Sequence, residues 1–451
     1  MAIVEVVADD PVPERSSQEV LRVLQQLSVK LRLPAELLPS FLIDDEASDE
    51  LAAFQRRTLR NLRETATTFQ TAREQWSFVP IEEQAEIYDP ILRLYTPTPS
   101  PQRMLIDEIT SHTRPSELAL YLLRDPLRAL FTPTPHPLLN PTTSRALSRP
   151  AGGPNANSDF HDTPHQLFKS PAGWGSYNVL FWCISQLKQD EMEKHIGVIL
   201  PPTLILMDDY EPVYRSKGLF VLGSWIRRLA NDMLIRMGIG KLILASLIHT
   251  LSLNANPPIK GVLPLALELI DRLVTKPKDK AERIEEVVDK GLIKSWIYAP
   301  SGVEGRVVLI DVSERLEILC GSIGISIVRW LKTIIPFLLE PLQYTPSPAV
   351  LPHYKANLRA LLTLMQTLSG SGRLDRWRGK ILDVLSRLWI NLNERGGVTG
   401  NDTEIRTSIQ AIFIELESQC PSVREVEYPQ LLDLDKTIFS SLIPTSSPAK
   451  A

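Results

Sequence analysis

The sequence contains few cysteines, and their scarcity limits the class of protein. Its 451 residues include only Cys183, Cys320 and Cys420, which are far apart and odd in number. A small secreted domain stapled by disulfides is therefore excluded. We expect a reducing compartment, in which each thiol is a small core residue.

Long apolar runs and a basic amino terminus are also missing. The chain opens with MAIVEVVADD, which turns acidic at once and lacks the basic region of a signal peptide. No apolar run reaches the ~18 residues that suggest a membrane span. We therefore expect a protein of the cytoplasm and nucleus.

An excess of positive charge is absent too. The formal net charge is −4, which argues against a general binder of nucleic acid or anionic membranes. Hydrophobic residues make up 43% and charged residues 23%, as in ordinary globular proteins. At roughly 100–200 residues per domain, the length allows two to four domains or one long repeat array.

No complete catalytic motif is present. The chain has neither a G-x-S-x-G elbow nor a C-x-x-C pair. Residues 238–241 read GIGK and mimic the end of a phosphate-binding loop, but Ile235 replaces its first glycine and Leu242 its hydroxyl. We therefore expect no enzymatic activity and no cofactor.

Two groups of residues are weak candidates for a metal site. His161 and His165 have a spacing that binds zinc on a helix, but a proline lies between them in a loop-like segment. The adjacent carboxylates of Asp208 and Asp209 need further oxygen ligands, and only Glu211 is near in sequence. We expect no bound metal at either place.

Proline is abundant, and its distribution predicts the domain organisation. The chain has 36 prolines, with clusters at 96–102 and 132–171 among glycine, serine and asparagine. Such segments bury too little apolar surface to offset chain entropy. We predict an N-terminal helical region over 1–131, a disordered linker over 132–171, a helical block over 172–444 and a disordered tail over 445–451.

A long polar helix is expected over residues 48–76. Its apolar stripe is thin, and Arg56, Arg57, Arg60 and Arg63 make one side basic. Two interpretations are open: a solvated helix face, or an arginine-lined docking face.

Helical periodicity dominates from residue 174 onward and is clearest over 196–229. Apolar residues recur there at steps of three and four, both before and after an acidic stretch at 208–212. This pattern predicts two amphipathic helices joined by an acidic turn. Asp209 or Glu211 is expected to receive free amide groups of the second helix, and Pro212 suits its first turn. We expect Asp208 and Asp209 to cap this helix and to pair with a base such as Lys217 or Arg215.

Further helix pairs follow at roughly 40 to 70 residue intervals, close to the period of HEAT repeats with inserted loops. We therefore predict an all-α fold of HEAT-like helical repeats that form an irregular α-solenoid, with a closed all-helical domain as the rival. Gly218 lies inside the second helix of the central pair, at a cost of ~1 kcal/mol relative to alanine. This indicates that another helix approaches closely there. Trp225 lies on the same helix, and we expect it in the core; if exposed, it would be an interface anchor.

The segment ILPPTLILMDDYEPVYRSKG resembles the signature of the Tel-two-interacting protein two family. The resemblance is specific over 174–229, and no family motif is recognised before Trp174. Met207 stands where the family pattern has leucine. The residues that carry the resemblance, the last four more loosely, are Leu200, Pro201, Pro202, Leu204, Asp208, Asp209, Tyr210, Tyr214, Lys217, Gly218, Trp174, Leu180, Trp182 and Leu187.

The resemblance implies a non-catalytic scaffold subunit of the Triple-T co-chaperone complex, in which two other helical-repeat subunits are its partners. That complex works with the ninety-kilodalton heat-shock chaperone to mature and stabilise phosphatidylinositol-kinase-related kinases. These clients include the target-of-rapamycin kinase and the DNA-damage checkpoint kinases. Neither nucleic acid nor a membrane is an expected partner. The alternative is another HEAT-repeat adaptor, such as a nuclear-transport or phosphatase scaffold.

Overall fold

The computed structural model describes residues 17–38, 49–71, 76, 78–132, 136–140, 142–143, 145–147, 166–394 and 400–443. Over these residues the regular secondary structure is helical, and the only β pairing is an isolated bridge between Leu139 and Ala146. The predicted all-α fold of packed helical repeats is therefore confirmed. The chain forms two compact units, Met1–Ile243 (unit 1) and Leu244–Ala451 (unit 2).

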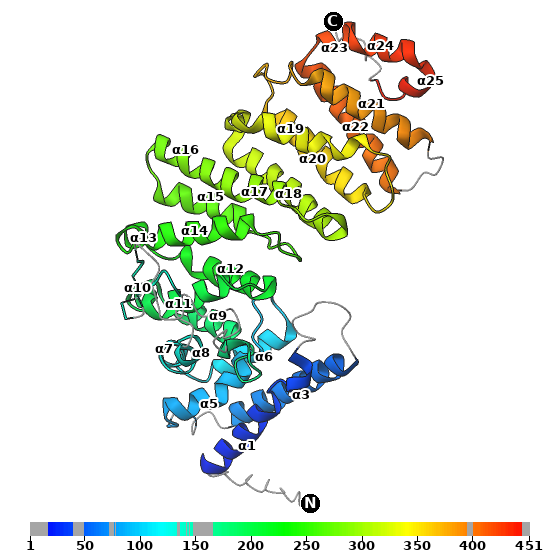
Figure 1. The fold of residues 1–451 in the computed structure, drawn as a ribbon. Coiled ribbons are helices and arrows are strands. Elements are labelled where there is room, and N and C mark those ends of the chain that lie inside the picture. Colours follow the sequence, from blue (N-terminus) through cyan, green and yellow to red (C-terminus); the bar gives the residue numbers. More distant parts are fainter. Residues whose placement is uncertain are drawn as a thin grey trace, which may run out of the picture. The chain divides into compact units, whose positions relative to one another are not determined.

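Unit 1 contains the amino-terminal helices (Figure 1). Their bounds are α1 Ser17–Lys30, η1 Ala35–Leu37, α3 Asp49–Thr71, α5 Ile81–Leu92, α6 Pro101–Thr110, α7 Pro115–Arg124, α8 Pro126–Phe131, η2 Leu167–Lys169, α9 Ser176–Gln186, α10 Gln189–Lys194, α11 Ile196–Met207, α12 Pro212–Ile226 and α13 Asn231–Arg236. The next helix, α14 (Ile239–Ser252), contains the boundary between the units.

Unit 2 contains the remaining helices. Their bounds are α15 Val262–Leu273, α16 Pro277–Glu286, η3 Val287–Ile293, α17 Lys294–Ile297, α18 Gly302–Ile323, η4 Gly324–Trp330, α19 Leu331–Leu339, η5 Pro341–Gln343, α20 Leu351–Thr367, α21 Arg378–Glu394, α22 Gly400–Gln419, α23 Ser422–Glu425, α24 Glu427–Leu434 and α25 Lys436–Phe439.

Packing within unit 1 follows the apolar stripes of its helices. Helix α3 packs on α1 and α6, α9 packs on α7 and α12, and α12 packs on α11. The stripes meet in a core that includes Phe54, Phe69, Trp182 and Leu204, each at most 2% exposed. No helix here could bury its apolar face alone, so each depends on its neighbours.

In unit 2, α20 packs between α18 and α22. The helical run Gly302–Gln343 is long and apolar enough, by length and composition, to cross a membrane. It is interrupted at Gly324, whose φ of 55° ends α18, and it continues as a 3-10 helix. Leu316, Ile334 and Leu338 are fully buried within the protein. Packing inside unit 2 therefore accounts for part of the apolar character of this run, whereas Ile318 and Ile325 are exposed.

The central pair, α11 and α12, forms as the sequence predicts. Pro201 and Pro202 lie inside α11, which begins at Ile196. Proline donates no backbone hydrogen bond, so the ladder of α11 is interrupted at its middle. Pro212 occupies the first turn of α12, as expected.

At Gly218 the two helices approach each other closely. A Cβ atom placed on it would lie 2.5 Å from the backbone nitrogen of Met207 and 2.9 Å from Cβ of Leu206. The predicted close helix contact is therefore confirmed, and it explains why α12 carries a glycine in its interior.

Replacing Gly218 with alanine should destabilise unit 1 by about 2 kcal/mol, and Gly218→Leu should cost more, because the backbone of α11 must move. Gly223→Ala on the same helix is the matched control, since its nearest obstacle is Nη1 of Arg227 at 3.7 Å. The control should keep or raise the melting temperature. Thermal unfolding followed by circular dichroism measures both, and equal melting of the two alanine variants would contradict the packing argument.

Candidate functional site

The acidic turn 208–211 between α11 and α12 is closed by its own groups. Oδ1 of Asp209 accepts the backbone N–H of Glu211 at 2.8 Å, which closes the turn before α12. Glu211 is the N-cap residue of α12, and its side chain makes no capping hydrogen bond. The prediction that Asp209 or Glu211 receives free amides of α12 is therefore wrong, because the bond of Asp209 goes to the residue that precedes the helix. Nε of Arg215 donates to the backbone oxygen of Asp209 at 2.7 Å. The bond from Glu211 orients the Asp209 carboxylate, and the bond from Arg215 holds the backbone of the turn.

The Asp209 carboxylate forms an ion pair with Lys169. Nζ of Lys169 donates to Oδ1 of Asp209 at 2.7 Å and to Oε1 of Glu211 at 2.7 Å. The side chain of Asp209 is fully buried, whereas that of Lys169 is 15% exposed. Burial raises the pKa of Asp209, against the opposing effect of the Lys169 ammonium. The ion pair therefore offsets only part of the desolvation cost.

Aromatic rings surround the same ammonium group. Nζ of Lys169 lies 4.0 Å from the ring centre of Tyr210 and 4.8 Å from that of Tyr214. The preceding residue, Phe168, stacks on Phe131 with ring centres 4.9 Å apart and meets Tyr214 edge-on at 5.5 Å. Cation–π attraction and apolar burial thus add to the ion pair.

The neighbouring carboxylate, Asp208, contacts a histidine. Nε2 of His136 lies 2.8 Å from Oδ2 of Asp208, and Nδ1 of His136 accepts the backbone N–H of Leu138 at 3.2 Å. Because Nδ1 is an acceptor, the ring proton is on Nε2 and is donated to the carboxylate. Both ring nitrogens of His136 are therefore engaged.

Asp208 contacts His136, and Asp209 contacts Lys169. His136 precedes and Lys169 follows residues 148–165, which lie outside the described residues. Leu139 and Phe168 belong to the predicted disordered linker, yet they are 3% and 1% exposed. The description of 132–171 as disordered is therefore wrong for these described parts, because composition alone misses the short run Leu167–Lys169, which supplies an aromatic ring and a cation. His161 and His165 also lie outside the described residues, and the domain limits as a whole stay a prediction.

The prediction that Asp209 pairs with Lys217 or Arg215 was wrong. Arg215 bonds the backbone oxygen of Asp209 rather than its carboxylate, and Lys217 lies over the ring of Tyr177 at 5.4 Å. The actual base, Lys169, is 40 residues upstream of Asp209. Sequence spacing gave no signal for this pair.

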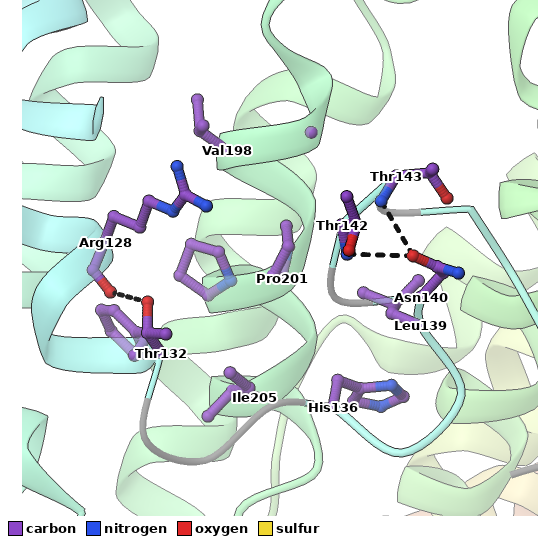
Figure 2. Close-up of a pocket in the computed structure, with 13 residues that line it drawn as sticks. Arg128, Thr132, His136, Leu139, Asn140, Thr142, Thr143, Val198, Pro201 and Ile205 are labelled. Carbon is purple, nitrogen blue, oxygen red and sulfur yellow. Dashed lines mark hydrogen bonds between the residues drawn. The ribbon is translucent and has the colours of Figure 1, made fainter. Parts of the chain in front are cut away.

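A cavity of about 330 Å³ opens beside the turn (Figure 2). Figure 2 shows Arg128 and Thr132 at one side, Asn140, Thr142 and Thr143 at the other, and Pro201 with Ile205 of α11 between them. His136 also lines it, and both of its ring nitrogens contact groups of the protein. The lining of the cavity thus combines polar and apolar side chains.

The other residues that carry the family resemblance build the core around this turn. Leu200, Leu204, Trp174 and Trp182 are buried. Trp225 is fully buried, and its Nε1 donates to Oγ1 of Thr203 at 3.3 Å, so it is a core residue and not an exposed anchor. Among the described residues, no group of three or more histidine, cysteine, aspartate or glutamate side chains could hold a metal ion.

Replacing Lys169 with methionine should destabilise the protein by about 2–3 kcal/mol, since it leaves the buried Asp209 carboxylate without its cation. Lys30→Met, at an exposed position of α1, is the control and should change stability by less than about 0.5 kcal/mol. Chemical denaturation measures both variants. The double variant Lys169→Met with Asp209→Asn should lose less than the two single effects together. Strict additivity would count against a direct pair.

The cost of Lys169→Met should also depend on pH. Burial raises the folded-state pKa of Asp209 above its ordinary value, so the folded protein binds that proton more tightly than the unfolded chain. The stability contributed by this group therefore falls as pH rises, and loss of the cation strengthens the trend. We expect the stability difference between variant and wild type to shrink from pH 7 to pH 5. A difference that stays constant between these pH values would contradict the assignment.

Comparisons with known proteins add to this description. No curated protein matches the chain. The crystal structure of an engineered protein aligns over 95% of both chains at 14% sequence identity, but its TM-score of 0.31 is too low to support an argument.

A model of the Tti2 family, the Tel-two-interacting protein two family, matches residues 83–348. The match covers more than half of the chain and includes α11, the acidic turn and α12. It begins well before Trp174, so the family pattern extends further toward the amino terminus than sequence inspection recognised. On this match, the chain belongs to the Tti2 family.

Proposed function

We propose that this chain is a non-catalytic scaffold subunit of the Triple-T complex. The family match over residues 83–348 is the observation that carries the proposal. Family membership supports a role as a subunit of a protein complex in general. The finer parts of the proposal are the two other helical-repeat subunits as direct partners, and the cytoplasm and nucleus as the place of action.

The architecture of the site supports a scaffold over an enzyme. The acidic groups of the turn are committed to internal contacts: Asp209 to Lys169, and Asp208 to His136. Groups that are engaged in this way position chain segments, whereas a catalytic acid or base needs contact with a substrate. The helices contribute extended surface, which is what repeat proteins use to bind other proteins.

The proposed cellular role follows from the family. As part of the Triple-T complex and together with the ninety-kilodalton heat-shock chaperone, the chain would support maturation of phosphatidylinositol-kinase-related kinases. The target-of-rapamycin kinase and the DNA-damage checkpoint kinases are the proposed clients. Depletion of the chain should therefore lower the steady-state amounts of these kinases.

Co-purification tests the proposal. An affinity-tagged copy of the full chain should recover two large helical-repeat subunits and kinase clients, identified by mass spectrometry. Recovery of transport receptors or phosphatase subunits in their place would favour the alternative HEAT-repeat adaptor. Recovery of neither group, or a tightly bound nucleotide or metal in the purified chain, would contradict the proposal.

A surface variant refines this test. Phe220 of α12 is 46% exposed and lies within the family match, so it is a candidate anchor for a partner subunit. Phe220→Glu should reduce recovery of the partner subunits at least about fivefold. The ring of Phe220 also lies 4.9 Å from that of Phe181, so circular dichroism must show that the variant remains folded. Phe78→Glu is the matched control, because Phe78 is 87% exposed and precedes the matched residues. Equal recovery with the two variants would exclude Phe220 from the interface.

A further inference from the structure

Three arginines form a stripe along α3, before the part of the chain that the family model matches. Arg56, Arg60 and Arg63 are all exposed, and their spacing places them on one side of the helix. From Arg56 to Arg63 the helix rises about 10 Å. We call these three residues the arginine stripe.

The arginine stripe has no acidic partner among the described residues. None of its guanidinium groups makes an ion pair or hydrogen bond there, whereas Arg93 and Arg387 each pair with an aspartate four residues earlier. Like charges at helical spacing repel one another. This repulsion lowers the stability of the isolated helix, and no ion pair of the three arginines offsets it inside the described structure.

A cavity of about 630 Å³ adjoins the stripe within unit 1. Arg56 and Leu59 of α3 line one part of it, while Trp174 and Lys217 line another. None of the described residues that line this cavity is acidic. Its walls thus combine cationic groups with apolar surface.

One polar group in the cavity wall is buried and lacks a partner. Thr58 is 3% exposed, and its Oγ1 makes no hydrogen bond within the described structure. Thr58 belongs to the lining of the cavity. A buried hydroxyl without a partner costs free energy, and an acceptor on a bound molecule would recover it.

We propose that the arginine stripe and this cavity bind an acidic segment of a partner protein. One apolar side chain of the segment enters the cavity against Leu59 and Trp174, and carboxylates on either side of it pair with Arg56, Arg60 and Arg63. A protein segment fits better than nucleic acid, because the cationic stripe is short, the cavity has apolar walls and the whole chain has a net charge of −4. This inference goes beyond the proposed function, because it assigns a binding surface that combines α3, which precedes the family match, with Trp174, which lies within it.

Fluorescence anisotropy with a labelled peptide tests the proposal. The probe has four glutamates around one leucine, and a second peptide carries glutamines in place of the glutamates. The full wild-type chain should bind the acidic peptide at least about tenfold more tightly than the neutral one, and added salt should weaken binding.

Variants separate charge from shape. Replacing Arg56, Arg60 and Arg63 together with glutamate should weaken binding of the acidic peptide at least about tenfold. Ala52→Phe should also weaken it, because Ala52 lines the cavity and the larger ring fills it. The matched control replaces Arg22, Arg145 and Arg236 with glutamate; all three are exposed, and the change in net charge is identical. The control should bind as the wild type does, and all variants should melt as the wild type does.

Several results would overturn the proposal. They are absence of binding by the wild-type chain, equal loss in the control, and equal affinity for the neutral peptide. Tighter binding of a single-stranded RNA of eight nucleotides would identify a nucleic-acid surface. A tenfold gain in peptide affinity after neutralising Asp44, Asp45 and Glu46 would identify the chain's own acidic segment as the occupant.

Discussion

The buried carboxylate of Asp209 is the constraint on which the central repeat depends. A charge with a fully buried side chain is stable only when a cation and hydrogen-bond donors meet it. Lys169 supplies the cation, and the backbone N–H of Glu211 supplies a donor. Both contacts are made by Oδ1, whereas the buried Oδ2 has no hydrogen-bond partner in the described structure. The ion pair of Oδ1 holds a segment 40 residues upstream onto the turn between α11 and α12.

That turn is itself held by close packing of the two helices. Gly218 lets the backbone of α12 approach Met207, and Thr203 of α11 accepts a hydrogen bond from the indole of Trp225. The direction of Asp209 is thus set by contacts deeper in the pair. Phe168, seated between Phe131 and Tyr214, then adds apolar burial to the ion pair that follows it in sequence. A rigid turn and its bound segment form one structural unit, as a scaffold requires.

The local sequence pattern was enough to predict the helices of this region, Pro212 in the first turn of α12 and a close helix contact at Gly218. Helical periodicity and the steric limits on proline and glycine depend only on neighbouring residues. The partners of the two aspartates were not predictable in the same way. His136 and Lys169 lie 72 and 40 residues upstream of Asp208 and Asp209, and no spacing rule joins them. The prolines and glycines of residues 132–171, which contain both partners, suggested disorder, although Phe168 and Leu139 in this range are buried. The arginines of α3 were visible in the sequence. Only the structure showed that Arg56, Arg60 and Arg63 have no acidic partner among the described residues and that Arg56 lines a cavity.

Hydrogen–deuterium exchange of the purified wild-type chain tests the central claim most directly. The amide of Glu211 is bonded to Asp209, and those of Lys169 and Trp174 are bonded to backbone oxygens within their own segment. If the segment is fixed on the turn, these amides should exchange as slowly as neighbouring amides of α11 and α12. Exchange of Lys169 and Trp174 at the rate of an unfolded peptide, beside a protected α12, would contradict the account.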